Sequence, residues 1–166
     1  IVSKIGNKCI QYFHENGVGT VMKHIPGHGL AKVDSHLKTP TVHKKLSYLI
    51  KEDFATFKKK ECLFAMTAHI IFSKIDNQNT VTHSKKLIRL IRNKIRFRNI
   101  LISDDISMKS LKGNIKENTI KTFKAGCNIV LHCNGNLKEM EIVGKNSPKI
   151  NNFILKKTSQ FYKILV

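Results

Sequence analysis

The amino-acid sequence predicts a parallel α/β fold. Four short apolar segments rich in Ile, Val and Leu alternate with longer helix-like segments, and one further helix-like segment precedes them. The connections between the apolar segments are long enough for the crossovers that parallel strands require. Polar residues also fall at or just after the end of each apolar segment, which is typical of strands that share one functional edge.

The helix-like segments carry apolar residues at helical spacing. Residues 3–15 form such a stripe, and Asn16-Gly17 follows it as a helix C-cap would. Ser84 is a good N-cap for a helix over residues 85–96. The remaining helices are predicted over residues 43–60, 115–124, around 137–143, and 150–166.

The predicted strands cover residues 18–22, 62–70, 99–103 and 128–133. A (β/α)₈ barrel collects its chemistry at the carboxyl ends of such strands, but it normally needs about 250 residues. We therefore expect a TIM (β/α)8 barrel of which about the last four β/α units are present. An open, flavodoxin-like sheet also fits four or five units, although it gives no reason for a reactive group after every strand. The polar groups in question are Lys23, His24, His69, Asp104, Asp105, His132 and Asn134.

The chain carries a formal net charge of +19, which first suggests a polyanionic partner. Of its thirty basic residues twenty-six are Lys and four are Arg, whereas nucleic-acid readers favour the planar guanidinium. The lysines are also spread along the whole chain. We therefore expect no nucleic-acid partner, and we attribute the charge to a general drift in composition.

The sequence has no apolar run of eighteen residues and no signal-like start, so we expect a cytoplasmic protein with no membrane partner. It opens with Ile1 and not with Met, so an upstream segment is an open alternative. The whole of residues 1–166 is interpreted as one partial catalytic domain. The oligomeric state is left open.

Cys9, Cys62, Cys127 and Cys133 form no C-x-x-C pair, which argues against a zinc knuckle or a redox motif. We expect four reduced, buried thiols.

The stretch from Lys23 to His36, KHIPGHGLAKVDSH, is the strongest candidate for a functional loop. It combines three histidines, one aspartate, one proline and two glycines directly after an apolar segment. Gly27 and Gly29 allow backbone conformations closed to other residues. Asp34 and His36 lie two residues apart, close enough for the carboxylate to orient the imidazole.

The motifs KHIPGHG, DSH, MTAHI, SDDISM and AGCNIVLHC occur in this order between about residues 18 and 136. Together they resemble the β-N-acetylglucosaminidases of glycoside hydrolase family three, NagZ type. The resemblance implies a TIM barrel that needs no metal or other cofactor and works in the cytoplasm. It also implies release of N-acetylglucosamine from muropeptides during peptidoglycan recycling. Against the family pattern, this chain corresponds to the C-terminal half of the barrel.

The resemblance also implies roles for individual residues. Asp104, the first acid of SDDISM, matches the nucleophile of a retaining mechanism. In the DSH motif, His36 matches the general acid/base and Asp34 its partner. Lys23 and His24 match residues that hydrogen-bond the hydroxyls of the bound sugar. An imidazole with an ordinary pKa near 6.5 suits proton transfer near neutral pH.

Plainer interpretations stay open for several residues. Asp104 and Asp105 can be ordinary polar strand ends, and since neighbours on a strand point to opposite sides, one of them should face the barrel mouth. We interpret His28 as a hydrogen-bonded scaffold of its loop, and His132 with Cys133 as packing residues. His69 either lines the site or satisfies neighbouring carbonyl groups.

Two departures from the family pattern affect function. Asn128 stands where the family usually has Asp, which removes a charge near the last strand and is expected to weaken its contact. The substrate-gripping Asp and Arg of the family belong to the half that is missing here, so we expect little or no activity from these 166 residues alone. The alternative function is a catalytically dead remnant that binds nucleic acid or an anionic surface through its charge.

Overall fold

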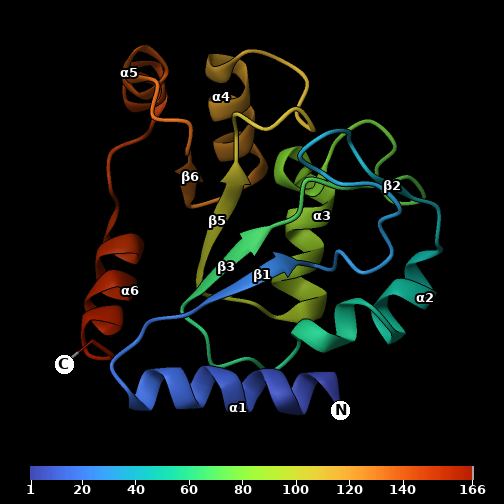
Figure 1. The fold of residues 1–166 in the computed structure, drawn as a ribbon, viewed down its shortest axis with the longest axis vertical. Coiled ribbons are helices and arrows are strands. Elements are labelled where there is room, and N and C mark those ends of the chain that lie inside the picture. The colour runs from blue at the N-terminus through green and yellow to red at the C-terminus, as the bar shows by residue number, and fades with distance from the viewer. Residues whose placement is uncertain (166) are drawn as a thin grey trace.

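A computed structural model of the protein describes residues 1–165. Four parallel strands form one sheet in the order β1 (Val21–Ile25), β3 (Phe64–Thr67), β5 (Ile100–Asp105) and β6 (Ile129–Leu131). The register pairs Phe64 with both Val21 and Ile100. The carboxyl ends of all four strands therefore meet at one edge of the sheet (Figure 1).

The helices lie around this sheet, as Figure 1 shows. Helix α1 (Val2–Glu15) lies beside the amino ends of the strands, at the bottom of the view. Helix α3 (Lys85–Leu90) and the π-helical turn η3 (Ile91–Ile95) cover one face of the sheet, because Leu87 of α3 and Ile91 of η3 belong to the same buried cluster as Ala65 of β3 and Leu101 of β5. The helical elements after α1 are α2 (Leu46–Lys51), η1 (Phe54–Phe57), η2 (Val81–His83), α3 (Lys85–Leu90), η3 (Ile91–Ile95), α4 (Ile115–Ala125), α5 (Leu137–Asn146) and α6 (Asn152–Tyr162).

Capping residues fix several helix ends where the sequence predicts them. The Ser84 hydroxyl accepts a hydrogen bond from the amide of Leu87 at 3.2 Å and begins α3. The Asn114 side chain accepts one from the amide of Glu117 at 2.9 Å and begins α4, which ends at Gly126 with φ 116°. The predicted helix over residues 85–96 forms as α3 followed by the π-helical turn η3, and it stops at Arg96.

The predicted helix over residues 43–60 is wrong. The chain forms the short α2 and then the 3₁₀ turn η1, because the backbone at Glu52, with φ −102° and ψ −78°, departs from helical geometry and ends α2. A two-residue strand, β2 (Thr41–Val42), precedes them and pairs with β4 (Ile71–Phe72). The pattern of apolar residues indicated neither of these short strands.

The strand boundaries also differ from the prediction. Strand β1 begins at Val21 and not at Val18, because the amide of Val18 donates to the carbonyl of Phe13 and keeps that residue in the turn after α1. Lys23 and His24 are consequently part of the strand. Strands β3 and β6 are shorter than predicted, whereas β5 continues through Asp104 and Asp105. Val166, the last residue of the predicted tail helix, lies outside the described residues.

All four cysteines are free thiols, but only two of them are buried. Cys62 and Cys127 lie in the core, and burial raises the pKa of the Cys127 thiol to about 12. Cys9 and Cys133 are exposed, so the prediction of four buried thiols is wrong for this pair. Across residues 1–165, none of the helices has the length and apolar character needed to cross a bilayer.

Asn128 anchors the start of β5. Its side-chain oxygen accepts hydrogen bonds from the amide of Leu101 at 2.9 Å and from Nη2 of Arg92 at 2.7 Å. Arg92 in turn donates to the backbone carbonyls of Phe97 and Asn99. A neutral amide thus makes both acceptor contacts, so the loss of a charge at this position does not remove the contact.

Replacing Asn128 tests how much these two hydrogen bonds contribute to the stability of the fold. We expect Asn128→Ala to lower the free energy of unfolding by about 2–3 kcal/mol, because the half-buried Arg92 guanidinium and the Leu101 amide both lose their partner. Asn128→Asp should be at least as stable as the native chain, because the carboxylate keeps the oxygen and adds a charge opposite Arg92. Urea unfolding followed by circular dichroism measures both, and equal stability of the Ala and Asp variants would contradict this assignment.

Candidate active site

The carboxyl edge of the sheet brings together His24 from β1, His69 from the segment after β3, and Asp104 and Asp105 from β5. The closest pair of charged or chargeable groups among them is His24 Nε2 and Asp104 Oδ2, which are 3.6 Å apart. These residues come from three separate β/α units. Their meeting is a direct result of the parallel register.

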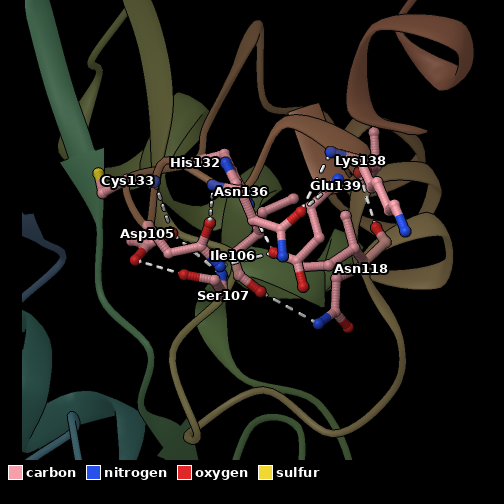
Figure 2. Close-up of polar contacts among 12 residues, drawn as sticks. Asp105, Ile106, Ser107, Asn118, His132, Cys133, Asn136, Lys138 and Glu139 are labelled. Atoms are coloured by element: carbon pink, nitrogen blue, oxygen red, sulfur yellow. Dashed lines mark hydrogen bonds and ion pairs between the residues drawn. The ribbon is translucent and has the colours of Figure 1, made fainter. Parts of the chain in front are cut away.

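Both carboxylate oxygens of Asp105 accept hydrogen bonds from neighbouring parts of the chain, as Figure 2 shows. Its Oδ1 accepts hydrogen bonds from the amides of Ser107 at 3.0 Å and Cys133 at 3.2 Å. Its Oδ2 accepts one from the Ser107 hydroxyl at 2.7 Å. This carboxylate ties the turn after β5 to the loop after β6.

In Asp104, by contrast, one carboxylate oxygen accepts no hydrogen bond within the described residues. Oδ1 accepts from the amide of Asp105 at 2.9 Å, whereas Oδ2 faces His24 and makes no hydrogen bond within residues 1–165. Its side chain is 16% exposed. Asp104 Oδ2 lies toward β1, whereas the Asp105 carboxylate is bound to the turn after β5 and to the loop after β6. Of the two aspartates, Asp104 is the one available for chemistry.

His69 satisfies a neighbouring carbonyl group, which was one of the two alternatives left open above. Its Nε2–H donates to the carbonyl of Asp105 at 3.0 Å, and its Nδ1 accepts from the hydroxyl of Thr82 at 2.7 Å. The Thr82 hydroxyl also lies 2.8 Å from the Thr67 hydroxyl and 3.4 Å from the Ala68 carbonyl. This tautomer is neutral, and complete burial lowers the pKa of His69 in agreement with it. Sequence reasoning missed both threonines, since nothing distinguishes them from other buried hydroxyls.

His24 is about a third exposed and lies close to Asp104. Burial lowers the pKa of His24, and the attraction of Asp104 only partly opposes that effect. At neutral pH the imidazole is therefore mainly uncharged, so it can both donate and accept a hydrogen bond. Lys23 is exposed at the adjoining position of β1.

His28 supports the loop, as predicted. Its ring centroid lies 5.6 Å from that of His24, and its Nε2 lies 3.4 Å from the Ser35 hydroxyl. Asp53 is a supporting residue that sequence reasoning missed, because it falls inside the segment predicted as a helix. A Cβ at Gly27, where φ is 155°, would collide with the Asp53 carboxylate. Burial raises the pKa of Asp53.

The DSH motif forms a self-contained pair on an exposed loop. Asp34 Oδ1 accepts from the backbone amide of His36 at 2.9 Å and lies 2.9 Å from its Nδ1. These two hydrogen bonds lower the pKa of Asp34 and keep it charged. The charged carboxylate holds a proton on Nδ1 of His36, and Nε2 of His36 makes no hydrogen bond within residues 1–165. The side chains are 59% and 75% exposed respectively. Within residues 1–165 neither residue makes a hydrogen bond or an ion pair with Lys23, His24 or Asp104. The DSH loop approaches these residues through His28, which lies beside both Ser35 and His24.

The residues after β6 are structural. The His132 side chain is nearly buried and its Nε2 lies 2.7 Å from Glu139 of α5, which also accepts from Asn134 (Figure 2). Cys133 contributes its backbone amide to Asp105. Residues 1–165 contain no group of three or more His, Cys, Asp or Glu side chains that could hold a metal ion.

Comparison with known proteins agrees with this arrangement. The sequence model of the "Glycosyl hydrolase family 3 N terminal domain" matches residues 1–153. The chain belongs to glycosyl hydrolase family 3. The parallel sheet is accordingly part of the TIM-barrel-like α/β fold of this family.

Curated relatives of this family 3 chain carry the name Beta-hexosaminidase. The protein from Actinobacillus pleuropneumoniae serotype 3 is 34% identical over 136 residues, which cover 78% of this chain and 39% of the relative. The protein from Idiomarina loihiensis is 28% identical over 151 residues, 89% of this chain and 46% of the relative. The family 3 chain thus spans less than half the length of these relatives.

Solved structures of N-acetylglucosamine-related enzymes are also similar to this chain. NagZ from Neisseria gonorrhoeae, in complex with N-trifluoroacetyl-D-glucosamine, superposes with a TM-score of 0.76 at 28% identity, over 89% of this chain and 43% of that one. The β-N-acetylglucosaminidase from Thermotoga maritima superposes with a TM-score of 0.76 at 26% identity, over 98% of this chain and 38% of that one.

The different tasks of the two aspartates predict different effects on stability. Asp105→Ala should lower the free energy of unfolding by about 2–3 kcal/mol, because it leaves the Cys133 and Ser107 amides unpaired. Asp104→Ala, the matched control on the neighbouring position, should cost less than about 1 kcal/mol, since it removes one local hydrogen bond. Urea unfolding of the two variants gives the comparison, and a larger loss for Asp104→Ala would reverse the assignment.

Proposed function

We propose that this family 3 chain supplies the nucleophile and the acid/base of a retaining β-N-acetylglucosaminidase. The observation that carries the proposal is the free Oδ2 of Asp104 at the carboxyl edge of the sheet, beside a neutral His24. A carboxylate whose other oxygen is fixed by a backbone amide is held in one orientation toward the face from which a sugar would enter.

In the first step Asp104 Oδ2 attacks the anomeric carbon of N-acetylglucosamine, and the bond from that carbon to the leaving oxygen breaks. His36 enters this step as the imidazolium, gives its Nε2 proton to the leaving oxygen and becomes neutral. In the second step His36 takes a proton from water, the water oxygen attacks the anomeric carbon, and the Asp104 carboxylate leaves. Asp34 keeps the Nδ1 proton in place and stabilises the imidazolium form of His36.

The exposure of the DSH loop fits this role. A general acid must meet the glycosidic oxygen, which projects from the sugar on the side away from the nucleophile. His36 therefore needs no ion pair with Asp104 in the absence of substrate, and within residues 1–165 it makes its ion pair with Asp34. His24 and Lys23 supply hydrogen bonds to the sugar hydroxyls, and the uncharged state of His24 allows it to accept as well as donate.

We propose that the substrate is a muropeptide with a terminal N-acetylglucosamine. The enzyme would release this sugar during peptidoglycan recycling in the cytoplasm. The names of the Beta-hexosaminidase relatives and the N-trifluoroacetyl-D-glucosamine bound to the Neisseria protein support the sugar. The muropeptide and the compartment rest on the motif resemblance alone.

We further propose that activity requires a complete barrel. Within the described residues β1 and β6 are the outer strands of the sheet, each with one hydrogen-bonded neighbour. Large apolar side chains of α5 and α6, such as Leu137, Met140 and Leu155, are exposed. Additional β/α units would close the sheet, cover apolar surface and complete the grip on the substrate.

The role of Asp104 is tested in a completed barrel, in which residues 18–136 replace the matching part of a relative such as the Neisseria protein. Hydrolysis of p-nitrophenyl N-acetyl-β-D-glucosaminide should fall by at least about 10³-fold in Asp104→Ala, because no covalent intermediate can form. The 166-residue chain alone should show little turnover. Unchanged hydrolysis by Asp104→Ala would remove the nucleophile assignment, and strong hydrolysis by the chain alone would contradict the need for a complete barrel.

His36 is tested separately through its two proton transfers. His36→Ala in the completed barrel should slow turnover by about 10²–10⁴-fold, the usual contribution of a general acid/base. Azide, which needs no deprotonation to attack, should restore turnover and give the β-glycosyl azide. Asp34→Asn should reduce turnover without azide rescue, because His36 is still present. Failure of azide to rescue His36→Ala would argue that His36 has a structural role.

A further inference from the structure

A second concave site lies at the amino edge of the sheet, opposite the edge that carries Asp104. It is a cavity of about 480 Å³ formed by residues 57–60, which precede β3, and residues 94–99, which precede β5. We refer to this cavity as the basic pocket. Its apolar floor includes the buried side chains of Ile95 and Phe97.

The walls of the basic pocket carry a concentrated positive charge. Six of its ten lining residues are basic, and none is acidic. None of these six takes part in an ion pair within residues 1–165. Like charges gathered without counter-charges repel one another, so a bound anion would relieve this repulsion. The six are Lys58, Lys59, Lys60, Lys94, Arg96 and Arg98.

Neighbouring backbone oxygens are used elsewhere and do not neutralise these cations. Arg92 donates to the carbonyls of Phe97 and Asn99, two of the residues that line the pocket. The carbonyl of Lys59 accepts from the side chain of Asn7 at 3.3 Å. Among the six cations, Lys60 alone donates a side-chain hydrogen bond within residues 1–165, to the backbone carbonyl and the hydroxyl of Ser3. Five cationic side chains remain available to a ligand.

The backbone of the pocket is also unusual. Lys59, with φ 53°, and Arg96, with φ 65°, are the two non-glycine residues with positive φ in the described chain, and both line this cavity. A side chain in this conformation is strained, and Gly would avoid the strain. The dipole of the preceding helix favours one cation at Arg96, but it does not account for six. Such strain gathers at functional sites.

We propose that the basic pocket binds a small anion that carries several linked phosphate groups. Its volume suits a compact ligand, and its charges converge from two segments around a partly apolar floor, where electrostatic attraction is less screened than at an open surface. A nucleic-acid strand would need an extended basic track with stacking aromatic groups. The proposal concerns the edge of the sheet away from Asp104 and does not depend on the proposed glycosidase activity.

The test must separate a local site from the general positive charge of the chain. Titration calorimetry with inorganic tripolyphosphate compares the 166-residue chain with two triple variants. One removes pocket charges: Lys58→Gln, Lys59→Gln and Lys94→Gln. The other removes three exposed lysines from the region of α5 and α6: Lys138→Gln, Lys149→Gln and Lys156→Gln. Both variants carry a net charge of 19 − 3 = +16, so only the location differs.

We expect one tripolyphosphate per chain and affinity at least about tenfold weaker in the pocket variant, since each charge-assisted hydrogen bond contributes appreciably. The control variant should change by less than about twofold. Equal weakening in both variants, or no binding by the native chain, would overturn the proposal. The proposal would also be overturned if an oligonucleotide bound the native chain, lost affinity only in the pocket variant, and tripolyphosphate did not bind. Circular dichroism checks folding, and the single variants Lys94→Gln and Arg98→Gln replace the triple variant if it unfolds.

Discussion

The buried imidazole of His69 fixes the part of the chain on which the candidate active site depends. Its hydrogen bond to the carbonyl of Asp105 joins the segment after β3 to the end of β5. The Asp105 carboxylate then joins the same point to the loop after β6. Asp105 is thus held through both its carbonyl and its carboxylate, and the Oδ2 of the preceding Asp104 lies toward His24 of β1. The Asp104 carboxylate is therefore positioned without a hydrogen-bond partner for Oδ2 within residues 1–165.

The neutral form of His69 fits this arrangement. With Nε2–H donating to the Asp105 carbonyl, Nδ1 accepts from the Thr82 hydroxyl, which also lies 2.8 Å from the Thr67 hydroxyl and 3.4 Å from the Ala68 carbonyl. Burial lowers the pKa of His69 in the same direction. The support for the site is therefore a matched set of hydroxyls and one tautomer, and no net charge is buried.

The sequence predicted the parts of the fold that local chemistry determines. Ser84 and Gly126 mark helix ends because capping is decided within a few residues, and the polar residues after each strand marked the functional edge. The limits of the strands depend on pairing between distant segments, so β1 and β5 were misplaced by two or three residues. The choice between Asp104 and Asp105 was likewise open, because it depends on Ser107 and Cys133, whose amides reach the carboxylate only in the folded chain.

The two edges of the sheet are chemically different although one strand connects them. The segment that closes the basic pocket leads into β5 at Ile100, and the same strand ends at Asp104. Six residues of strand extend about 20 Å, so the cations of the pocket do not contact the Asp104 carboxylate directly. A structural coupling between the edges would pass through the position of β5 itself, which Asn128 and Arg92 hold at one end and His69 holds at the other.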